Sequence, residues 1–205
     1  MAKRATRESY GLALAQYGVD KNIVVLDADL SKSTKTDTFK KVYPERFINM
    51  GIAEGNMMSV AAGIASTGKT VFASSFAMFA AGRAFEQIRN SIGYTNLNVK
   101  IGATHAGISV GEDGGSHQCL EDIALMRSIP NMVVISPADD IEAQMAVKAA
   151  IEHNGPVYLR FGRLAAEDVN REGYKFELGK GVELRSGDDA AIVATGLTVG
   201  MALEA

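Results

Sequence analysis

The sequence predicts a doubly wound α/β fold built on a mainly parallel sheet. Short apolar runs alternate with segments of helix length along the chain. The runs lack the polar alternation of a strand with one face in water, so they fit strands buried on both faces beneath covering helices. Alternating strands and helices then give the doubly wound arrangement. The expected strands cover residues 23–26, 47–50, 71–73, 99–103, 132–135 and 157–159.

One helix carries clear signals at both ends. Asp139 and Glu142 form a capping box before the largely apolar stretch 141–151, and a turn at 154–156 ends the segment. His153 stands at this end. There we expect a cation near a helix C-terminus and not a catalytic group.

The chain divides into one complete domain and the start of another. We assign residues 1–163 to the α/β domain and the charged, glycine-punctuated stretch 164–187 to a linker. Residues 188–205 are expected to begin a second, truncated α/β domain. Within it, 190–195 predict a strand and a helix begins near Thr198.

Composition narrows the class of protein. A chain of 205 residues is long enough for one ordinary α/β core. Its 21 basic and 24 acidic residues give a net charge of -3 with no block of one sign, so we expect no nucleic-acid partner. The single Cys119 excludes an internal disulfide, the start at residues 1–6 is followed by no apolar signal-peptide core, and no apolar stretch has the length of a membrane span. We therefore expect a soluble, cytoplasmic protein that does not bind membranes.

Residues 63–70 match the phosphate-loop pattern but stand in the wrong context. Such a loop follows a strand and opens a helix, so that backbone N–H groups face the phosphates. Here the apolar run 60–65 continues a helix, Gly68 is placed to end it, and a strand follows at 71–73. We reject the nucleoside triphosphate site. Binding of a fluorescent ATP analogue that depends on Lys69 would contradict this interpretation.

Glu54 is the first candidate for chemistry. It follows the strand at 47–50 and stands where a helix should begin, so its carboxyl group lies at the edge where ligands bind in open α/β sheets. An acid that interacts with the helix macrodipole is the structural alternative. Ala53 and Gly55 leave room beside the carboxyl group, and Ile52 with the neighbouring methionines is expected to desolvate it. These neighbours favour a functional role.

Phe76 and Phe79 follow the next strand and should therefore lie at the same edge of the sheet. Two aromatic rings there can stack on a flat ligand ring, and two core phenylalanines are the alternative. The order of the elements, with Glu54 after the preceding strand, favours the ligand.

The segment 104–118 is polar and glycine-rich, and it contains His105, Asp113 and His117. Loops of this composition lie on the surface or around a site. A metal site formed by these three side chains matches no zinc spacing. Cys119, next to this loop, is expected to be a buried, inert thiol and not a nucleophile.

Several motifs occur in a fixed order. They are Gly-Ile-Ala-Glu-Gly-Asn-Met at 51–57, Gly-Ile-Ala-Ser-Thr-Gly at 63–68, Gly-Glu-Asp-Gly-Gly-Ser-His-Gln at 111–118, Ile-Pro-Asn at 129–131 and Ser-Pro-Ala-Asp at 136–139. Together, over nearly the whole chain, they resemble the pyrimidine-binding domain of transketolases and the similar deoxyxylulose phosphate synthases.

The resemblance implies a thiamine diphosphate enzyme. In this family a carboxylic acid, hydrogen-bonded to a ring nitrogen of the aminopyrimidine, activates the cofactor, and Glu54 matches that acid. Phe76 and Phe79 match the aromatic wall around the ring, and Asp29 and Ser33 match a loop that lines the cofactor and substrate channel. The protein then supplies orientation, proton transfer and a dry pocket.

The resemblance also implies a sugar phosphate as substrate. The positions that match the phosphate-binding set are Arg7, Ser33, His105 and Arg160. Arg163 is close enough in sequence to compete with Arg160. Asp113 matches a residue that reads a substrate hydroxyl, and His117 matches one that contacts the carbonyl end of the donor, which makes it a catalytic candidate beside Glu54.

Departures from the family pattern bear on substrate and assembly. Gly82 stands where tyrosine is common, and Ala106 and Gly115 replace a frequent Asp and Pro, which leaves the sugar open. No Gly-Asp-Gly motif with a following Asn occurs, so the diphosphate and Mg²⁺ need ligands from another chain.

The resemblance therefore implies the C-terminal subunit of a split transketolase. It would act with an N-terminal, diphosphate-binding subunit, in a homodimer or heterotetramer, to transfer a two-carbon ketol unit between sugar phosphates. Three alternatives remain: a deoxyxylulose phosphate synthase-like subunit, a β-subunit of a 2-oxo acid dehydrogenase, and a noncatalytic assembly subunit.

Overall fold

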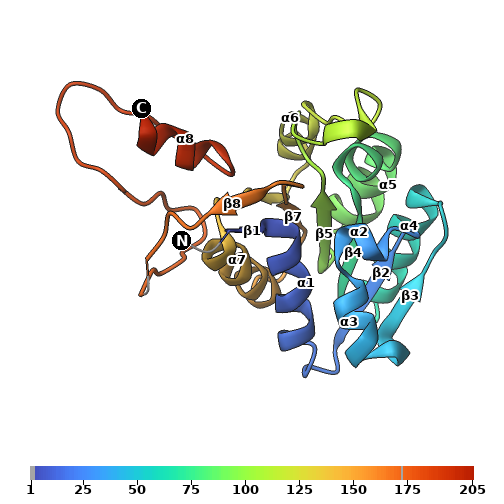
Figure 1. Cartoon of the computed structure of the whole chain (residues 1–205). Coiled ribbons are helices and arrows are strands. Elements are labelled where there is room, and N and C mark those ends of the chain that lie inside the picture. The colour runs from blue at the N-terminus through green and yellow to red at the C-terminus, as the bar shows by residue number, and fades with distance from the viewer. Residues whose placement is uncertain (1–2, 172) are drawn as a thin grey trace.

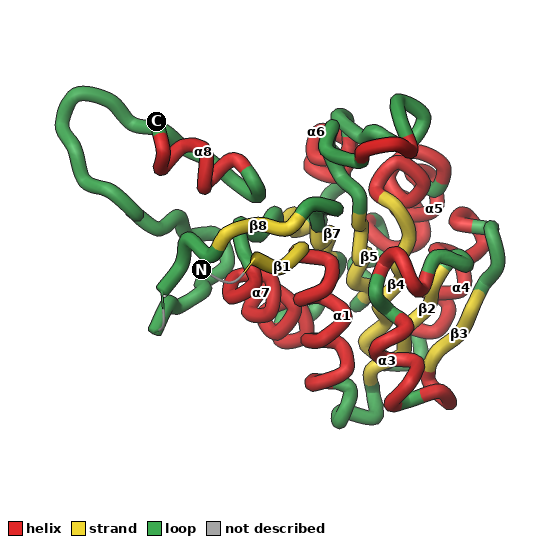
Figure 2. Tube along the Cα trace, in the orientation of Figure 1, coloured by secondary structure: helices red, strands yellow, loops and turns green. Residues whose placement is uncertain are grey.

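The computed structural model describes residues 3–171 and 173–205. Its centre is a six-stranded, wholly parallel sheet in the order β3-β2-β4-β5-β7-β6 (Figures 1 and 2). The strands are β2 Ile23–Asp27, β3 Phe47–Asn49, β4 Thr70–Phe76, β5 Val99–Thr104, β6 Val133–Ile135 and β7 Val157–Arg160. The predicted fold class and the six predicted strands are confirmed.

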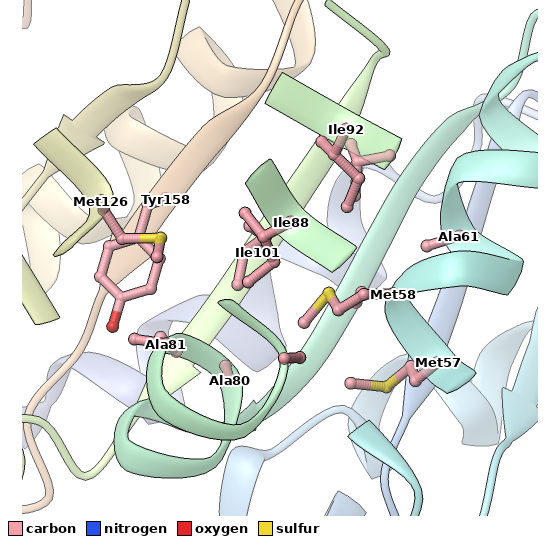
Figure 3. Close-up of a cluster of buried hydrophobic side chains, with 14 of the residues drawn as sticks. Met57, Met58, Ala61, Ala80, Ala81, Ile88, Ile92, Ile101, Met126 and Tyr158 are labelled. Carbon is pink, nitrogen blue, oxygen red and sulfur yellow. The ribbon is translucent and has the colours of Figure 1, made fainter. Parts of the chain in front are cut away.

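Helices cover both faces of the sheet. One face packs against α1 Thr6–Tyr17, α3 Asp37–Val42 and α7 Asp140–Glu152. The other packs against α4 Glu54–Ala65, α6 Asp122–Arg127, and α5 Phe85–Gln87 with the π-helical turns Met78–Arg83 and Ile88–Gly93 on either side of it. Short α2, Ser31–Thr34, follows β2. Figure 3 shows the second core, where Met58 of α4 points toward Ile88 and Ile101.

The capping box of α7 forms as the sequence predicts. The side chain of Asp139 accepts a hydrogen bond from the backbone N–H of Glu142 at 2.8 Å, and Glu142 accepts one from the N–H of Ala138 at 2.7 Å. The second oxygen of Asp139 accepts the N–H groups of Val169 and Asn170. One carboxylate thus starts the helix and also fastens the chain that leaves the domain.

Burial on both faces was a wrong expectation for the edge strands. The central strands β4 and β5 are buried along their whole length. In β3 at one edge, however, Ile48 is 38% exposed and Asn49 is also exposed. An edge strand has a neighbour on one side only, so helices that cover the sheet centre leave its outer face partly open.

The end of α7 corrects the role expected of His153. Burial and the nearby Lys100 lower the pKa of His153, so the side chain is not the cation expected at a helix C-terminus. Lys100 is the basic group that caps this end of the helix. It is fully buried, and its Nζ donates to the carbonyl oxygens of His153 and Gly155 at 2.7 and 2.6 Å.

The phosphate-loop context is absent, as the sequence indicates. Helix α4 ends at Ala65, Gly68 adopts a φ of 90°, and β4 begins at Thr70. The motif therefore joins a helix to a strand, which is the reverse of the order that phosphate binding requires.

Two short strands join the beginning and the end of the domain. Strand β1, Lys3–Ala5, pairs antiparallel with β8, Ala165–Glu167, which lies within the stretch expected to be a linker. The strand expected at 190–195 is wrong, since the structure describes these residues and they form no strand. Helix α8, Thr198–Glu204, does form and lies at the end of an extended loop (Figure 1). Within the described ranges, no helix is long and apolar enough to cross a membrane.

Candidate active site at the carboxyl edge of the sheet

The strand order makes β2 and β4 the point where the chain connections diverge. The chain leaves β2 toward β3 on one side and leaves β4 toward β5 on the other. Neighbouring strands whose connections diverge in this way form a topological switch point, where ligands bind in open α/β sheets. The segments that follow β2, β3, β4 and β5 all end here, and they carry most of the predicted site residues.

Glu54 is a buried acid at this switch point. It is the first residue of α4 and is only 3% exposed. Its carboxylate accepts hydrogen bonds from Arg83 Nη1, at 3.2 Å to Oε1 and 3.3 Å to Oε2, and a long one from Ser75 Oγ at 3.5 Å. Ile52 does not desolvate it as expected, because Ile52 is itself 79% exposed.

Four rings gather beside this acid. Phe76 ends β4 and Phe79 follows in the π-helical turn, with ring centroids 5.8 Å apart and planes inclined by 23°. His105 lies 3.9 Å from Phe76, and His117 meets both phenylalanines edge-on at 5.9 and 5.0 Å. The structure thus brings together Phe76, Phe79 and the two histidines that were predicted from separate segments.

His105 is held in an unusual conformation at the end of β5. Its φ of 57° lies in the left-handed region, and the ring is buried with Nδ1 3.0 Å from Thr104 Oγ1. Burial first, and the positive charge of Arg7 second, lower the pKa of His105 to about 4. The imidazole is therefore neutral at pH 7 and carries one N–H donor and one acceptor.

The loop after His105 is fastened at its base and open at its tip. Gly107 and Cys119 exchange backbone hydrogen bonds of 2.9 and 3.3 Å. Burial raises the pKa of Cys119 to about 11, which fits an inert thiol. Asp113 is exposed at the tip, and His117 is half-buried with Nδ1 2.9 Å from Ser116 Oγ.

The loop after β2 is organised by a buried carboxylate that sequence reasoning missed. Asp27 accepts hydrogen bonds from the N–H of Leu30 and from the hydroxyls of Thr34 and Thr36 at 2.6, 2.7 and 2.9 Å. Burial raises the pKa of Asp27. The turn that results gives Asp29 a φ of 63°, and Asn49 Nδ2 donates to its carboxylate at 2.8 Å.

The arginines form two different groups. Arg7 Nη1 donates to the carbonyl of Ser33 at 2.8 Å, so this predicted pair does meet. Arg163 contributes to the lowered pKa values of both Arg7 and His105, which places its charge near them. Arg160 instead donates from Nε to the fully buried carboxylate of Asp122 at 2.8 Å.

Arg83 was also missed from the sequence. Besides its contact with Glu54, its guanidinium carbon lies 4.1 Å from the centroid of the Phe79 ring. A signal was present, because residues four apart on a helical segment share a face, and Phe79 and Arg83 have that spacing. No group of three or more His, Cys, Asp or Glu residues that could hold a metal ion occurs in the part of the chain that the structure describes.

Comparison with known proteins gives the same family throughout. Residues 2–168 match the family "Transketolase, pyrimidine binding domain". The chain is 55% identical over 98% of its length to a Methanocaldococcus jannaschii protein described, provisionally, as a transketolase C-terminal section, and 41% identical over 96% to a 6-deoxy-6-sulfo-D-fructose transketolase subunit of Clostridium sp. (strain MSTE9). It spans 65% and 62% of the length of these two relatives.

Solved structures agree in fold. A split gene transketolase described as an inactive β4 tetramer superposes with a TM-score of 0.90 at 56% identity, over 99% of this chain and 66% of that one. A Pichia stipitis transketolase complexed with sedoheptulose-7-phosphate gives a TM-score of 0.74 at 28% identity, over 82% of this chain and 27% of that one. The chain belongs to the transketolase family and contains its pyrimidine-binding domain.

Proposed function

We propose that the chain is a subunit of a thiamine diphosphate-dependent transketolase and that Glu54 activates the cofactor pyrimidine. The observation that carries this proposal is the nearly complete burial of the Glu54 carboxylate beside the Phe76–Phe79 pair at the switch point of the sheet. A buried acid next to two nearly parallel rings suits a flat, nitrogen-containing ligand better than it suits a hydrophobic core.

The residues of the pocket fit an aminopyrimidine. Gln87 lies beside Gly55, since a Cβ added at Gly55 would be 3.4 Å from Gln87 Oε1. This oxygen is a buried acceptor with no hydrogen-bond partner among the described residues. Bound thiamine diphosphate supplies the carbanion chemistry. Glu54 holds a proton at a ring nitrogen, Phe76 and Phe79 orient the ring, and their apolar surfaces exclude water.

The phosphate end of the substrate would lie at the arginine group. Arg7 Nε is buried and has no hydrogen-bond partner among the described residues, although Nη1 binds Ser33. An unused buried donor beside a second cation, Arg163, suits a phosphate dianion. Neutral His105 adds one hydrogen bond. Arg160 is less suited than Arg163, since Arg160 pairs with the fully buried Asp122 at 2.8 Å, whereas the partner of Arg163, Glu112 at 3.1 Å, is 82% exposed.

The other predicted residues remain at the reacting end. His117 contacts both phenylalanine rings, so it is near the place where the donor carbonyl would stand. Asp113 is exposed at the tip of the loop, and the resemblance assigns it to a substrate hydroxyl. Together these groups fit transfer of a two-carbon ketol unit from a ketose phosphate to an aldose phosphate.

We further propose that a separate N-terminal subunit binds the diphosphate and Mg²⁺. The sequence lacks the Gly-Asp-Gly motif with a following Asn that would supply those ligands. Two relatives support this division, one described as a C-terminal section and the other as a split gene transketolase in an inactive β4 tetramer. The active assembly would then be a dimer of such pairs.

Reconstitution tests the proposal. The chain is combined with its N-terminal partner, thiamine diphosphate and Mg²⁺, and ketol transfer is compared for wild type, Glu54→Gln and the exposed-site control Glu152→Gln. We expect kcat to fall by about 10²- to 10⁴-fold in Glu54→Gln, because Gln keeps the shape but cannot give up a proton. The control should match wild type.

Three other outcomes of the reconstitution would contradict the proposal. Equal turnover of Glu54→Gln and wild type would exclude the proposed mechanism. Consumption of pyruvate with release of CO₂ would identify a deoxyxylulose phosphate synthase-like enzyme. Partner binding without activity, with every sugar phosphate pair tried, would favour a noncatalytic assembly subunit.

A further inference from the structure

The guanidinium of Arg83 lies between the two groups that are proposed to hold the cofactor ring. Nη1 is 3.2 and 3.3 Å from the oxygens of Glu54, and the guanidinium carbon is 4.1 Å from the centroid of the Phe79 ring. The group therefore donates to the buried acid and stacks on the aromatic wall at the same time.

A guanidinium and an aminopyrimidine make the same kinds of contact. Both are planar, both present N–H groups at one edge, and both stack on an aromatic face. The Glu54 carboxylate and the Phe79 ring are the partners of the guanidinium in this structure and the proposed partners of the ring. Arg83 thus occupies the pocket in the way that the ring would.

The contact is built so that it can open. The side chain of Arg83 is 53% exposed, whereas that of Glu54 is 3% exposed. Within residues 3–171 and 173–205, Arg83 has hydrogen bonds to Glu54 only. A long side chain with half its surface in water can turn outward by breaking only its contacts with Glu54 and Phe79, and the entering cofactor ring would replace both.

We propose that Arg83 is a gate of the ring pocket: it fills the space between Glu54 and Phe79 when the cofactor is absent and must swing out before the cofactor ring can enter. The gate rests on the proposed function. It also keeps the buried Glu54 carboxylate paired while the pocket is empty, since an unpaired buried charge is costly.

Binding measurements on the reconstituted complex test the gate. Thiamine diphosphate with Mg²⁺ is titrated by calorimetry into complexes that contain wild type, Arg83→Ala or the exposed control Arg89→Ala. We expect Arg83→Ala to bind about two- to fivefold more tightly, the size that a half-exposed ion pair contributes. Arg89→Ala should bind like wild type, because the exposed side chain of Arg89 bonds only its neighbour Asn90 within the described chain.

A second measurement needs no cofactor binding. In the ¹⁵N-arginine-labelled chain alone, the side-chain N–H signal of Arg83 should shift on Glu54→Gln and stay unchanged on Glu152→Gln. No shift would show that the contact does not exist and would overturn the gate.

The outcomes separate the gate from the proposed function. If Arg83→Ala leaves the affinity unchanged or weakens it while Glu54→Gln still abolishes turnover, the gate is overturned and the proposed function stands. If wild type and Arg83→Ala both fail to bind thiamine diphosphate, the proposed function fails and the gate fails with it. Tighter binding by Arg83→Ala alone supports both.

Discussion

Two buried charged residues lie at opposite ends of the same sheet and have opposite surroundings. Lys100 stands near the amino end of β5, fully buried, with two backbone carbonyls as partners. Glu54 stands at the carboxyl end, beside β4, and its partner Arg83 is half in water. Both side chains are therefore buried. What differs is the partner: backbone carbonyls hold Lys100, whereas a half-exposed side chain holds Glu54, for which we propose a functional role.

The largest expected effect on stability concerns Lys100. Lys100→Ala removes a fully buried stem and leaves the carbonyls of His153 and Gly155 without their donor. We expect a loss of about 3–5 kcal/mol in the free energy of unfolding, from the cavity and the unpaired acceptors together. Urea unfolding followed by circular dichroism measures it, with exposed Lys148→Ala as control. Equal unfolding midpoints for Lys100→Ala and Lys148→Ala would contradict a structural role for Lys100.

A pH dependence should follow from the same residue. Burial lowers the pKa of Lys100 to about 7, whereas an unfolded lysine titrates near about 10.4. Between these values the unfolded chain binds the additional proton, so stability rises as pH increases from about 7 to 10.

Lys100→Met isolates this contribution. We expect wild type to gain about 1–3 kcal/mol relative to Lys100→Met across that range, since the neutral amine still donates to both carbonyls. Urea midpoints at four pH values provide the test. Parallel curves for the two proteins would mean that Lys100 stays charged, or equally neutral, throughout.

The smallest effect is expected at the functional end. In a double-mutant cycle of Glu54→Gln and Arg83→Ala, the coupling in the free energy of unfolding should be only about 0.2–1 kcal/mol, because half of the arginine side chain lies in water. Urea unfolding of the four proteins measures it. A coupling of several kcal/mol would mean that Arg83 is a fixed structural partner, like the carbonyls around Lys100. That result would contradict the gate.

The sequence predicted the fold well where local pattern decides the structure. Apolar runs gave the six strands, and the spacing of Asp139 and Glu142 gave a capping box that the structure contains. Glu54, Phe76 and Phe79 could be placed at one edge because parallel strands bring their carboxyl ends together.

The remaining features depend on partners far apart in sequence. The choice between Arg160 and Arg163 depends on Asp122, which is 38 positions before Arg160 and already pairs with it. The contact of Arg83 with Glu54 spans 29 positions. The neutral state of His153 comes from burial and from Lys100 on another element. Periodicity carries no information on such pairs, because they are set by side-chain direction in the folded chain.

The pairing of β1 with β8 has a consequence for how this unit is used in longer proteins. Residues 3–5 and 165–167 lie hydrogen-bonded side by side, so the path into the domain and the path out of it are neighbours in space. A unit with adjoining entry and exit can be spliced into or released from a longer polypeptide without disturbing its interior. Relatives in which the matched region is a third of the length, such as the transketolase-like protein 1 of Macaca fascicularis, and others in which it is nearly two-thirds, show the same module in both settings.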